Sequence, residues 1–366
     1  MAYQKVGGTP RFYIDIPSYL NSIGVEYTAE ELIGNTTLSK DLFGLNPSNP
    51  VLIGNEQSMS ITINLPNGLG NFSDTTKGYF GMLNHSISDD IYFSAQAELS
   101  YADNIINSDL SGGVASRQLS IYNKGFSIFS YNETIDTNKD SLKFTNIYHY
   151  SSTYEPIPLY MGCITFGSYY DMPVSPDLDL SMEIEFDGVN NIKTLSGATI
   201  TQANYQGSPW WYDADGNKRE PWAIGESTNI ANSENLTPSD YLETPREMSK
   251  RNGRRVWNLS FSYMSDKDLF ASNYGSSTYL ETNTDYDNSD LTTDSNDFQY
   301  TIDDDDSFSA QVLNKISHGQ KFIFQPDNTN ANPDQFAICV LDQDSFSMKR
   351  TAYNVYDISM KIKEVW

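Results

Sequence analysis

Histidine and basic residues are scarce in this chain of 366 residues. It contains three His, at positions 85, 149 and 318, and only 23 Lys and Arg against 48 Asp and Glu, which gives a net charge of −25. Phosphate binding needs clustered Lys and Arg, so we expect no nucleic-acid partner. The three His lack ligand-like spacing to one another, which argues against a histidine-based metal or catalytic site.

Cysteine and long apolar runs are also few. The two cysteines, Cys163 and Cys339, lie in apolar strand-like segments, which predicts two buried free thiols. A long-range disulfide stays open, because the sequence does not place the two side chains. No apolar run approaches the ~20 residues of a membrane helix, and the N-terminus lacks the apolar core of a signal peptide. We therefore expect synthesis in a cytoplasm and no membrane insertion.

Motifs that carry enzyme chemistry are missing as well. The chain has no Gly-rich phosphate loop, nucleophile elbow or zinc-ligand pair. The segment Asp213-Ala-Asp215-Gly-Asn217 is similar to the start of a calcium loop, but no closing Glu follows, and a tight turn explains it. The acidic stretch from Asp285 to Asp306 is either a solvated loop or a contact for a divalent cation or a basic partner. We predict no enzyme, no catalytic residue, no cofactor and no metal site.

The dominant pattern in the sequence is a period-2 alternation of apolar and polar residues, with 25 Tyr and 18 Phe. Such alternation is typical of strands with one buried face, and aromatic residues favour strands. The clearest segments are 59–65, 180–186, 257–263 and 356–362, separated by turn signals such as Asp187-Gly188. The sequence predicts an all-β, mainly antiparallel fold: a β-sandwich followed by a β-barrel with one short helix.

Evidence for helices is limited. Phe308, Val312 and Ile316 have helical spacing and follow four consecutive Asp, whose charge suits a helix N-terminus. His318-Gly319 is a plausible stop. A shorter turn is expected after Ser265-Asp266, over residues 267–271, and another candidate is 28–33.

Composition divides the chain into three parts. Residues 1–51 are irregular and contain Pro10, Pro17, Pro47 and Pro50, so they are expected to form an extended arm that wraps a neighbour. Residues 52–176 form the predicted sandwich, and residues 177–366 form the predicted barrel with long loop insertions at 207–249 and 272–300.

Two groups of side chains are candidate contact surfaces. A basic cluster in this acidic chain is a candidate interface with a neighbouring copy, or else a solvated loop; it comprises Arg246, Lys250, Arg251, Arg254 and Arg255. An aromatic cluster in a polar segment, Trp210, Trp211 and Tyr212, is a candidate contact for a glycan or a protein partner. The same aromatic residues are also suited to closing the end of a barrel.

Several segments resemble those of tailed-bacteriophage tail proteins. In the C-terminal third, Gly253-Arg-Arg-Val-Trp257 precedes the predicted helix, Phe322-Ile-Phe324-Gln-Pro326 follows it, and Ile358-Ser-Met-Lys-Ile-Lys-Glu364-Val closes the chain. This order resembles the β-barrel module of minor tail and distal tail proteins. Upstream, Met82-Leu-Asn-His85 is similar to a segment of the β-sandwich domains in phage tail-tip proteins.

The resemblance implies a virion structural protein that acts by assembly. It implies a ring or adaptor at the distal end of a phage tail, linking the tube to the tip or fibres, with copies of itself and other tail proteins as partners. Such a protein is made in the host cytoplasm and ends in the virion. The alternative is a glycan-binding module that recognises a host surface polysaccharide, and a third hypothesis is a glycoside hydrolase, for which no pair of carboxylates stands out.

Overall fold

The structure is a computed structural model, and it describes the strands, helices and some connecting segments of the chain. The described residues are 8–26, 28–31, 36–37, 40–48, 50–54, 58–64, 77–85, 95–101, 104–109, 126–132, 141–148, 159–178, 181–186, 189–203, 211–212, 218–219, 253–269, 307–331, 335–353 and 355–365. The loop insertions predicted at 207–249 and 272–300 lie almost entirely outside these residues, as does the acidic stretch 285–306.

Most strands belong to one large antiparallel sheet of 11 strands. Its main path runs β12-β17-β21-β19-β18-β1-β11-β6-β9, while β20 pairs with β21 and β4 pairs with β11. The bounds are β1 Arg11–Asp15, β4 Val51–Gly54, β6 Lys77–His85, β9 Phe126–Asn132, β11 Leu159–Asp171, β12 Ser181–Glu185, β17 Arg254–Ser265, β18 Phe322–Gln325, β19 Ala337–Leu341, β20 Met348–Ala352 and β21 Val355–Glu364.

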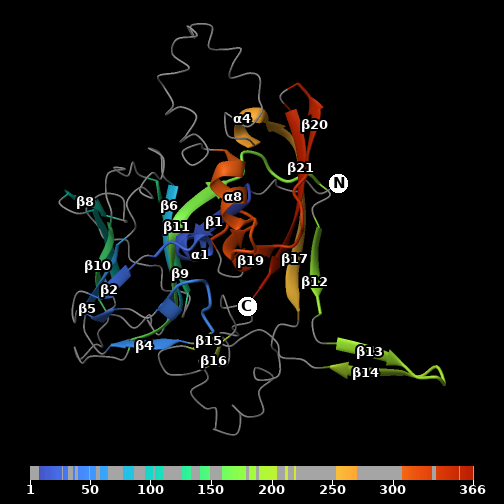
Figure 1. Cartoon of the computed structure of the whole chain (residues 1–366), viewed down its shortest axis with the longest axis horizontal. Coiled ribbons are helices and arrows are strands. Elements are labelled where there is room, and N and C mark those ends of the chain that lie inside the picture. The colour runs from blue at the N-terminus through green and yellow to red at the C-terminus, as the bar shows by residue number, and fades with distance from the viewer. Residues whose placement is uncertain are drawn as a thin grey trace, which may run out of the picture.

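The other strands form a second sheet and two small hairpins. The six-stranded sheet has the order β3-β2-β5-β10-β7-β8 and lies on the left of Figure 1. Its strands are β2 Thr28–Glu31, β3 Thr36–Thr37, β5 Ser58–Asn64, β7 Ala95–Tyr101, β8 Asn104–Asp109 and β10 Ser141–Tyr148. The hairpins are β13 (Val189–Lys193) with β14 (Thr199–Ala203), and β15 (Trp211–Tyr212) with β16 (Lys218–Arg219). The predicted all-β, mainly antiparallel class is confirmed.

The core of the large sheet follows the predicted alternation in β17 and β21. Trp257, Leu259 and Phe261 are buried, and in β21 so are Ile358, Met360 and Ile362. These side chains form one cluster with Phe12, Phe322 and Phe324. The alternation fails at one predicted position, Tyr263, which is exposed: the register between β17 and β21 shifts between Phe261 and Met264, and a bulge of this kind turns the following side chains over.

The first strand of the chain, β1, lies inside the large sheet. It pairs with β11 on one side and with β18 on the other, so Phe12 lies opposite both Tyr170 and Phe324. Residues 11–15 were expected in an extended arm, and they are instead a central strand. The physical reason is their burial: the run Phe12-Tyr13-Ile14 is apolar, and all three side chains are at most 3% exposed.

The large sheet also crosses the expected division at residue 176. Strands from both sides of that point join through β1, because β11 and β18 pair with its two edges. The described strands of this sheet follow an open path, with β12 at one end and β9 at the other. The described strands therefore form no closed barrel.

The helices agree with the sequence in two places and differ in two. The predicted helix occupies Ser309–Leu313 (η4) and Asn314–Ile316 (α8), ends before Gly319 at φ +78°, and buries Phe308, Val312 and Ile316. The turn after Ser265 is α4, Asp266–Leu269. A helix at 28–33 was wrong, since Thr28–Glu31 is strand β2.

Helix α1, Ile16–Ile23, was not predicted, although it carries its own sequence signals. The side chain of Asp15 accepts a hydrogen bond from the backbone of Ser18 as an N-cap, Pro17 lies in the first turn, and Gly24 ends the helix at φ +73°. One further turn of 3₁₀ helix, η1, covers Lys40–Leu42. No helix among the described residues is long and apolar enough to cross a membrane.

Both cysteines are buried, and neither forms a disulfide. Cys163 lies on β11 and Cys339 on β19, and each is fully shielded from solvent, as the sequence predicted. Burial in an apolar environment disfavours the thiolate and raises the pKa of Cys163. The two residues act as core side chains.

Candidate functional site

The large apolar side chains that the structure describes as exposed gather in one region of the chain. Most of them lie between residues 178 and 200, on strand β12, on the hairpin β13–β14 and next to them. They are Leu178, Met182, Ile184, Phe186, Ile192, Leu195 and Ile200, and we call these seven residues the apolar edge. Exposed apolar side chains grouped along one segment are a candidate interaction site.

Strand β12 carries two residues of the apolar edge, Met182 and Ile184, on the core face of the large sheet. Met182 lies directly opposite Trp257, and Ile184 lies opposite Arg255. Residues opposite one another in an antiparallel pair have their side chains on the same face, and both Trp257 and Arg255 are buried. The core face of the sheet therefore continues onto β12, where Met182 is still 55% exposed and Ile184 46%. The predicted strand is present, but the prediction that its apolar face is buried was wrong.

The opposite face of β12 is acidic. Glu183 and Glu185 are both exposed and alternate with the apolar residues. Glu185 forms an ion pair with Lys363 of β21 at 2.5 Å. The strand thus combines an apolar face with a negatively charged one, at the end of the sheet.

The hairpin β13–β14 projects away from the body of the molecule, as Figure 1 shows at the lower right. Ile192 lies opposite Ile200 in the hairpin, and each is 55% exposed. At the tip, the backbone N–H of Ala198 donates to the hydroxyl of Thr194. An isolated two-stranded hairpin is only marginally stable in water. A hairpin with an exposed pair of isoleucines therefore gains stability when another surface covers it.

The described part of the predicted basic cluster does not form an exposed patch. Arg255 is 9% exposed and donates to Glu364 from its backbone N–H, its Nε and one terminal nitrogen, at 2.9 to 3.2 Å. The same terminal nitrogen donates to the carbonyl oxygen of Phe336 at 2.6 Å, and the guanidinium lies 5.2 Å from the centre of a Trp257 ring. Arg255 belongs to the interior because its charge is balanced within the chain.

The remaining members of that cluster divide into two groups. Arg254 is partly buried on β17, with its side chain on the face opposite that of Arg255. Arg246, Lys250 and Arg251 lie outside the described residues. Of the predicted interface residues, therefore, the structure places two, and it separates them onto the two faces of one strand.

The described part of the aromatic cluster is buried too. Trp211 is 2% exposed and packs in a cluster with Tyr13, Tyr79 and Ile338. This burial corrects the expectation that Trp211 contacts a glycan, because its ring is covered by the chain itself. Trp210 and the side chain of Tyr212 lie outside the described residues.

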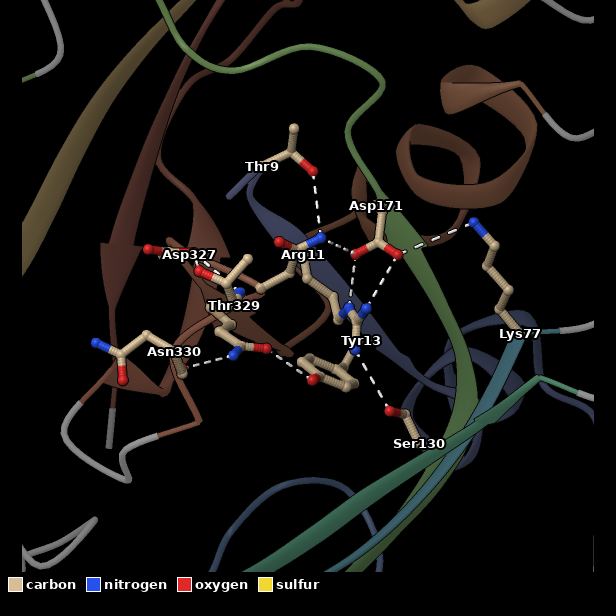
Figure 2. A network of polar contacts seen from close by, with 11 residues as sticks. Thr9, Arg11, Tyr13, Lys77, Ser130, Asp171, Asp327, Thr329 and Asn330 are labelled. Carbon is tan, nitrogen blue, oxygen red and sulfur yellow. Dashed lines mark hydrogen bonds and ion pairs between the residues drawn. The ribbon is translucent and has the colours of Figure 1, made fainter. Parts of the chain in front are cut away.

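A polar network joins the N-terminal strand to its neighbours (Figure 2). Arg11 forms a two-point ion pair with Asp171, with Nε–Oδ1 at 2.6 Å and a second contact at 3.0 Å, and its guanidinium lies 4.1 Å from the centre of the Tyr169 ring. Asn328 also donates to Asp171, at 3.0 Å. Asp327 accepts from the backbone N–H of Gly8 at 2.8 Å. These contacts hold residues 8–11 against β11 and the segment after β18, which is a structural role.

A buried carboxyl group lies at the junction of β1 and α1. Asp15 is 2% exposed, and its oxygens accept from the backbone N–H of Ser18 at 3.0 Å and the hydroxyl of Thr165 at 2.7 Å. The hydroxyl of Tyr79 lies 2.8 Å from that of Thr165, which extends the chain of hydrogen bonds. Loss of water raises the pKa of Asp15 to about 6, although its hydrogen bonds with Ser18 and Thr165 work in the opposite direction.

We expect Asp15→Asn to change how the stability of the protein depends on pH. Because the folded-state pKa is about 6 against an ordinary 3.8, the stabilisation from this group is present at low pH and is lost as pH rises through about 6. Asn keeps an oxygen for the helix cap and does not titrate. The free energy of unfolding of the variant, relative to the original protein, should rise by about 2 kcal/mol between pH ~4 and pH ~7. Urea unfolding over this range measures the difference, and a constant difference would contradict the assignment.

The described residues offer little else that points to chemistry. Among them, no group of three or more His, Cys, Asp and Glu side chains is placed to hold a metal ion. His85 is buried on β6, in agreement with a structural role. The acidic stretch 285–306 and the segment 213–217 lie outside the described residues, so the alternatives for the acidic stretch stay open.

The apolar edge was missed at the sequence level, although its residues were seen. The alternation at 180–186 predicted a strand with an apolar face, and in a single chain such a face is expected to be buried. Nothing in the alternation says whether the cover comes from the same chain or from another molecule. Comparison with known protein families, with curated proteins and with solved structures finds no significant match for the chain.

Proposed function

We propose that this chain is a structural protein of a tailed-bacteriophage virion that works by assembly and performs no catalysis. It is a ring or adaptor component near the distal end of the tail, where it links the tube to the tip or fibres. Its partners are further copies of itself and other tail proteins. It is made in the host cytoplasm and becomes part of the particle.

The observation that carries the proposal is the apolar edge on an all-β body. Met182 and Ile184 extend the core face of the large sheet past its last covered strand. A protein that functions alone covers or blunts such an edge, because an exposed apolar edge strand promotes association. An assembly subunit leaves the surface open for its neighbour. The net charge of −25 keeps the free subunit soluble before assembly.

The arrangement of the C-terminal strands supports the resemblance on which the proposal depends. β17 is followed in the chain by the helical segment 308–316, then by β18, and β21 closes the chain. This is the order of elements that the resemblance to distal tail proteins implies. β17, β21, β19 and β18 are also consecutive neighbours in the large sheet, so these segments form one unit of packing.

The glycan-binding alternative receives no support from the described residues. It depended on an exposed aromatic platform, and Trp211 is covered by the chain. We therefore propose assembly alone.

Antibody labelling of virus particles tests the proposed location. Antibodies raised against the purified chain are applied to tailed particles from the host that carries this gene, and the particles are viewed by electron microscopy. We expect label at the distal end of the tail, and mass spectrometry of the same particles should detect the chain. Particles that contain no trace of the chain, or label confined to the head, would overturn the proposal.

A further inference from the structure

Strand β12 is the last strand at one end of the large sheet, and it carries an apolar face, an acidic face and an open side. We propose that β12 docks against strand β20 of a second copy of this chain, so that the sheet continues from one copy to the next. The inference depends on the proposed function, since it names the surface through which the subunits assemble.

The first argument is the backbone of β12. Its residues pair with β17 on one side, from Ser181 opposite Asn258 to Glu185 opposite Arg254. On its other side it pairs with no strand that the structure describes. The open side of a strand presents N–H and C=O groups that bind an added strand by main-chain hydrogen bonds. The apolar edge lies beside these groups, so an added strand would cover Met182 and Ile184.

The second argument is charge, which selects the occupant. A chain with 48 acidic and 23 basic residues repels copies of itself, so two copies attract only where a basic surface meets an acidic one. The acidic face of β12 presents Glu183 and Glu185. Strand β20 is itself an edge strand that pairs only with β21 among the described strands, and it exposes two basic residues. Lys349, opposite Asp357, lies on the face of the sheet that carries Glu183 and Glu185, and Arg350 lies on the other face.

Of these two side chains, Lys349 is available for a contact with the acidic face of β12. Within the described residues, neither Lys349 nor Arg350 forms an ion pair, whereas Lys361 is paired with Asp342 and Lys363 with Glu185. Arg350 donates to the carbonyl oxygen of Ala352 in its own turn. Both β12 and β20 are five residues long, so one strand matches the other in length.

The third argument is the placement of the two edges. On one side of its backbone, β21 pairs with β17, and β17 pairs in turn with β12. On its other side, β21 pairs with β19 and with β20. β12 and β20 therefore lie toward opposite edges of the sheet. In each copy, β20 can dock against β12 of one neighbour while β12 binds β20 of another neighbour. Such a head-to-tail contact repeats, and it forms a ring when the rotation closes.

The hairpin β13–β14 extends the same surface. It follows β12 directly in the chain and exposes Ile192, Leu195 and Ile200. A neighbour seated along β12 lies within reach of this hairpin, and its cover would stabilise the exposed isoleucine pair. The contact thus combines strand addition, apolar burial and opposite charges.

The test is the solution mass of the purified full-length chain, measured by light scattering over a range of concentrations. We expect the original chain to associate as concentration rises, and more weakly at high salt. Glu183→Lys and Lys349→Glu should each weaken association about tenfold. The two changes combined in one chain should restore it, because the swapped charges meet again between copies. Ile184→Asp should weaken association too, whereas Ile23→Asp, an exposed apolar residue on α1, should not.

Three results would overturn the inference: a monomer at every concentration, association unchanged by Ile184→Asp, or single charge variants that weaken association without recovery in the combined variant. All substituted positions are exposed, and circular dichroism verifies that each variant folds. Failure here is separable from failure of the proposed function, because the place of the chain in the virion is established by labelling particles.

Discussion

Replacement of Glu364 by alanine is expected to lower the free energy of unfolding by about 3–5 kcal/mol. The carboxyl group of Glu364 is 2% exposed and accepts hydrogen bonds from the backbone and the guanidinium of Arg255. Its removal leaves a positive charge inside the protein without its carboxylate partner, while the hydrogen bond to the carbonyl of Phe336 remains. The cost comes from this unbalanced charge more than from the loss of the pair itself.

Urea unfolding of the purified chain measures the loss of stability, and two further variants serve as comparisons. Asp342→Ala removes an ion pair with Lys361 whose side chains are 37% and 44% exposed, and it should cost at most about 1 kcal/mol. A chain with both Arg255→Met and Glu364→Met should recover much of the lost stability, because it buries no charge. A loss for Glu364→Ala as small as that for Asp342→Ala would show that water reaches Arg255.

Replacement of Phe12 by alanine is expected to cost about 3–5 kcal/mol. The ring is 0% exposed and lies 5.3 to 5.7 Å, centre to centre, from those of Phe308, Phe322 and Phe324. The substitution leaves a cavity where the central strand, the helix and β18 meet, and such rigid surroundings collapse only in part.

The matched control for Phe12→Ala is Tyr263→Ala. Tyr263 is also an aromatic residue on a strand of the large sheet, but it is 80% exposed, so its removal should change stability by no more than about 0.5 kcal/mol. Thermal and urea unfolding measure both variants. If Phe12→Ala were as mild as the control, residues 11–15 would not be an integral strand of the sheet.

The sequence predicts the strands whose alternation reports burial within one chain. β17 and β21 were found this way, and the helix 308–316 was found from three apolar residues at helical spacing. In each case one local pattern determines both the element and its buried face. The same logic missed α1, because its signals are the two helix caps and a proline. These signals lie in residues 1–51, which were interpreted as irregular because they contain several prolines.

Local sequence patterns do not predict the position of β1 in the sheet. Phe12-Tyr13-Ile14 is too short a run to be told from any apolar segment, and its partners are near residues 170 and 324. Pairing at this distance depends on the whole fold, which no window of sequence contains. The expected boundary at residue 176 was a consequence of treating each part of the chain as closed on itself.

The candidate surface shows a similar limit. Charge counting selected Arg254 and Arg255 because they are basic, but an Arg in a sequence of strands is either exposed or balanced by a buried acid such as Glu364. The sequence offers no means to tell these apart until β17 and β21 are neighbours. Met182 and Ile184 were visible as alternation, and only the order of strands in the sheet reveals that no described strand pairs with the open side of β12.

The central position of β1 also has a consequence for folding of the chain during its synthesis on the ribosome. Tyr13 and its hydrogen-bond partner Gln325 are separated by 312 residues. At roughly 5–20 residues per second, tens of seconds pass between the emergence of β1 and that of β18. During that time Phe12 and Ile14 have no strand to complete their burial on the β18 side. We therefore expect the nascent chain to depend on chaperones until its last strands are made, and a ribosome-stalled chain that ends before residue 320 to be sensitive to protease.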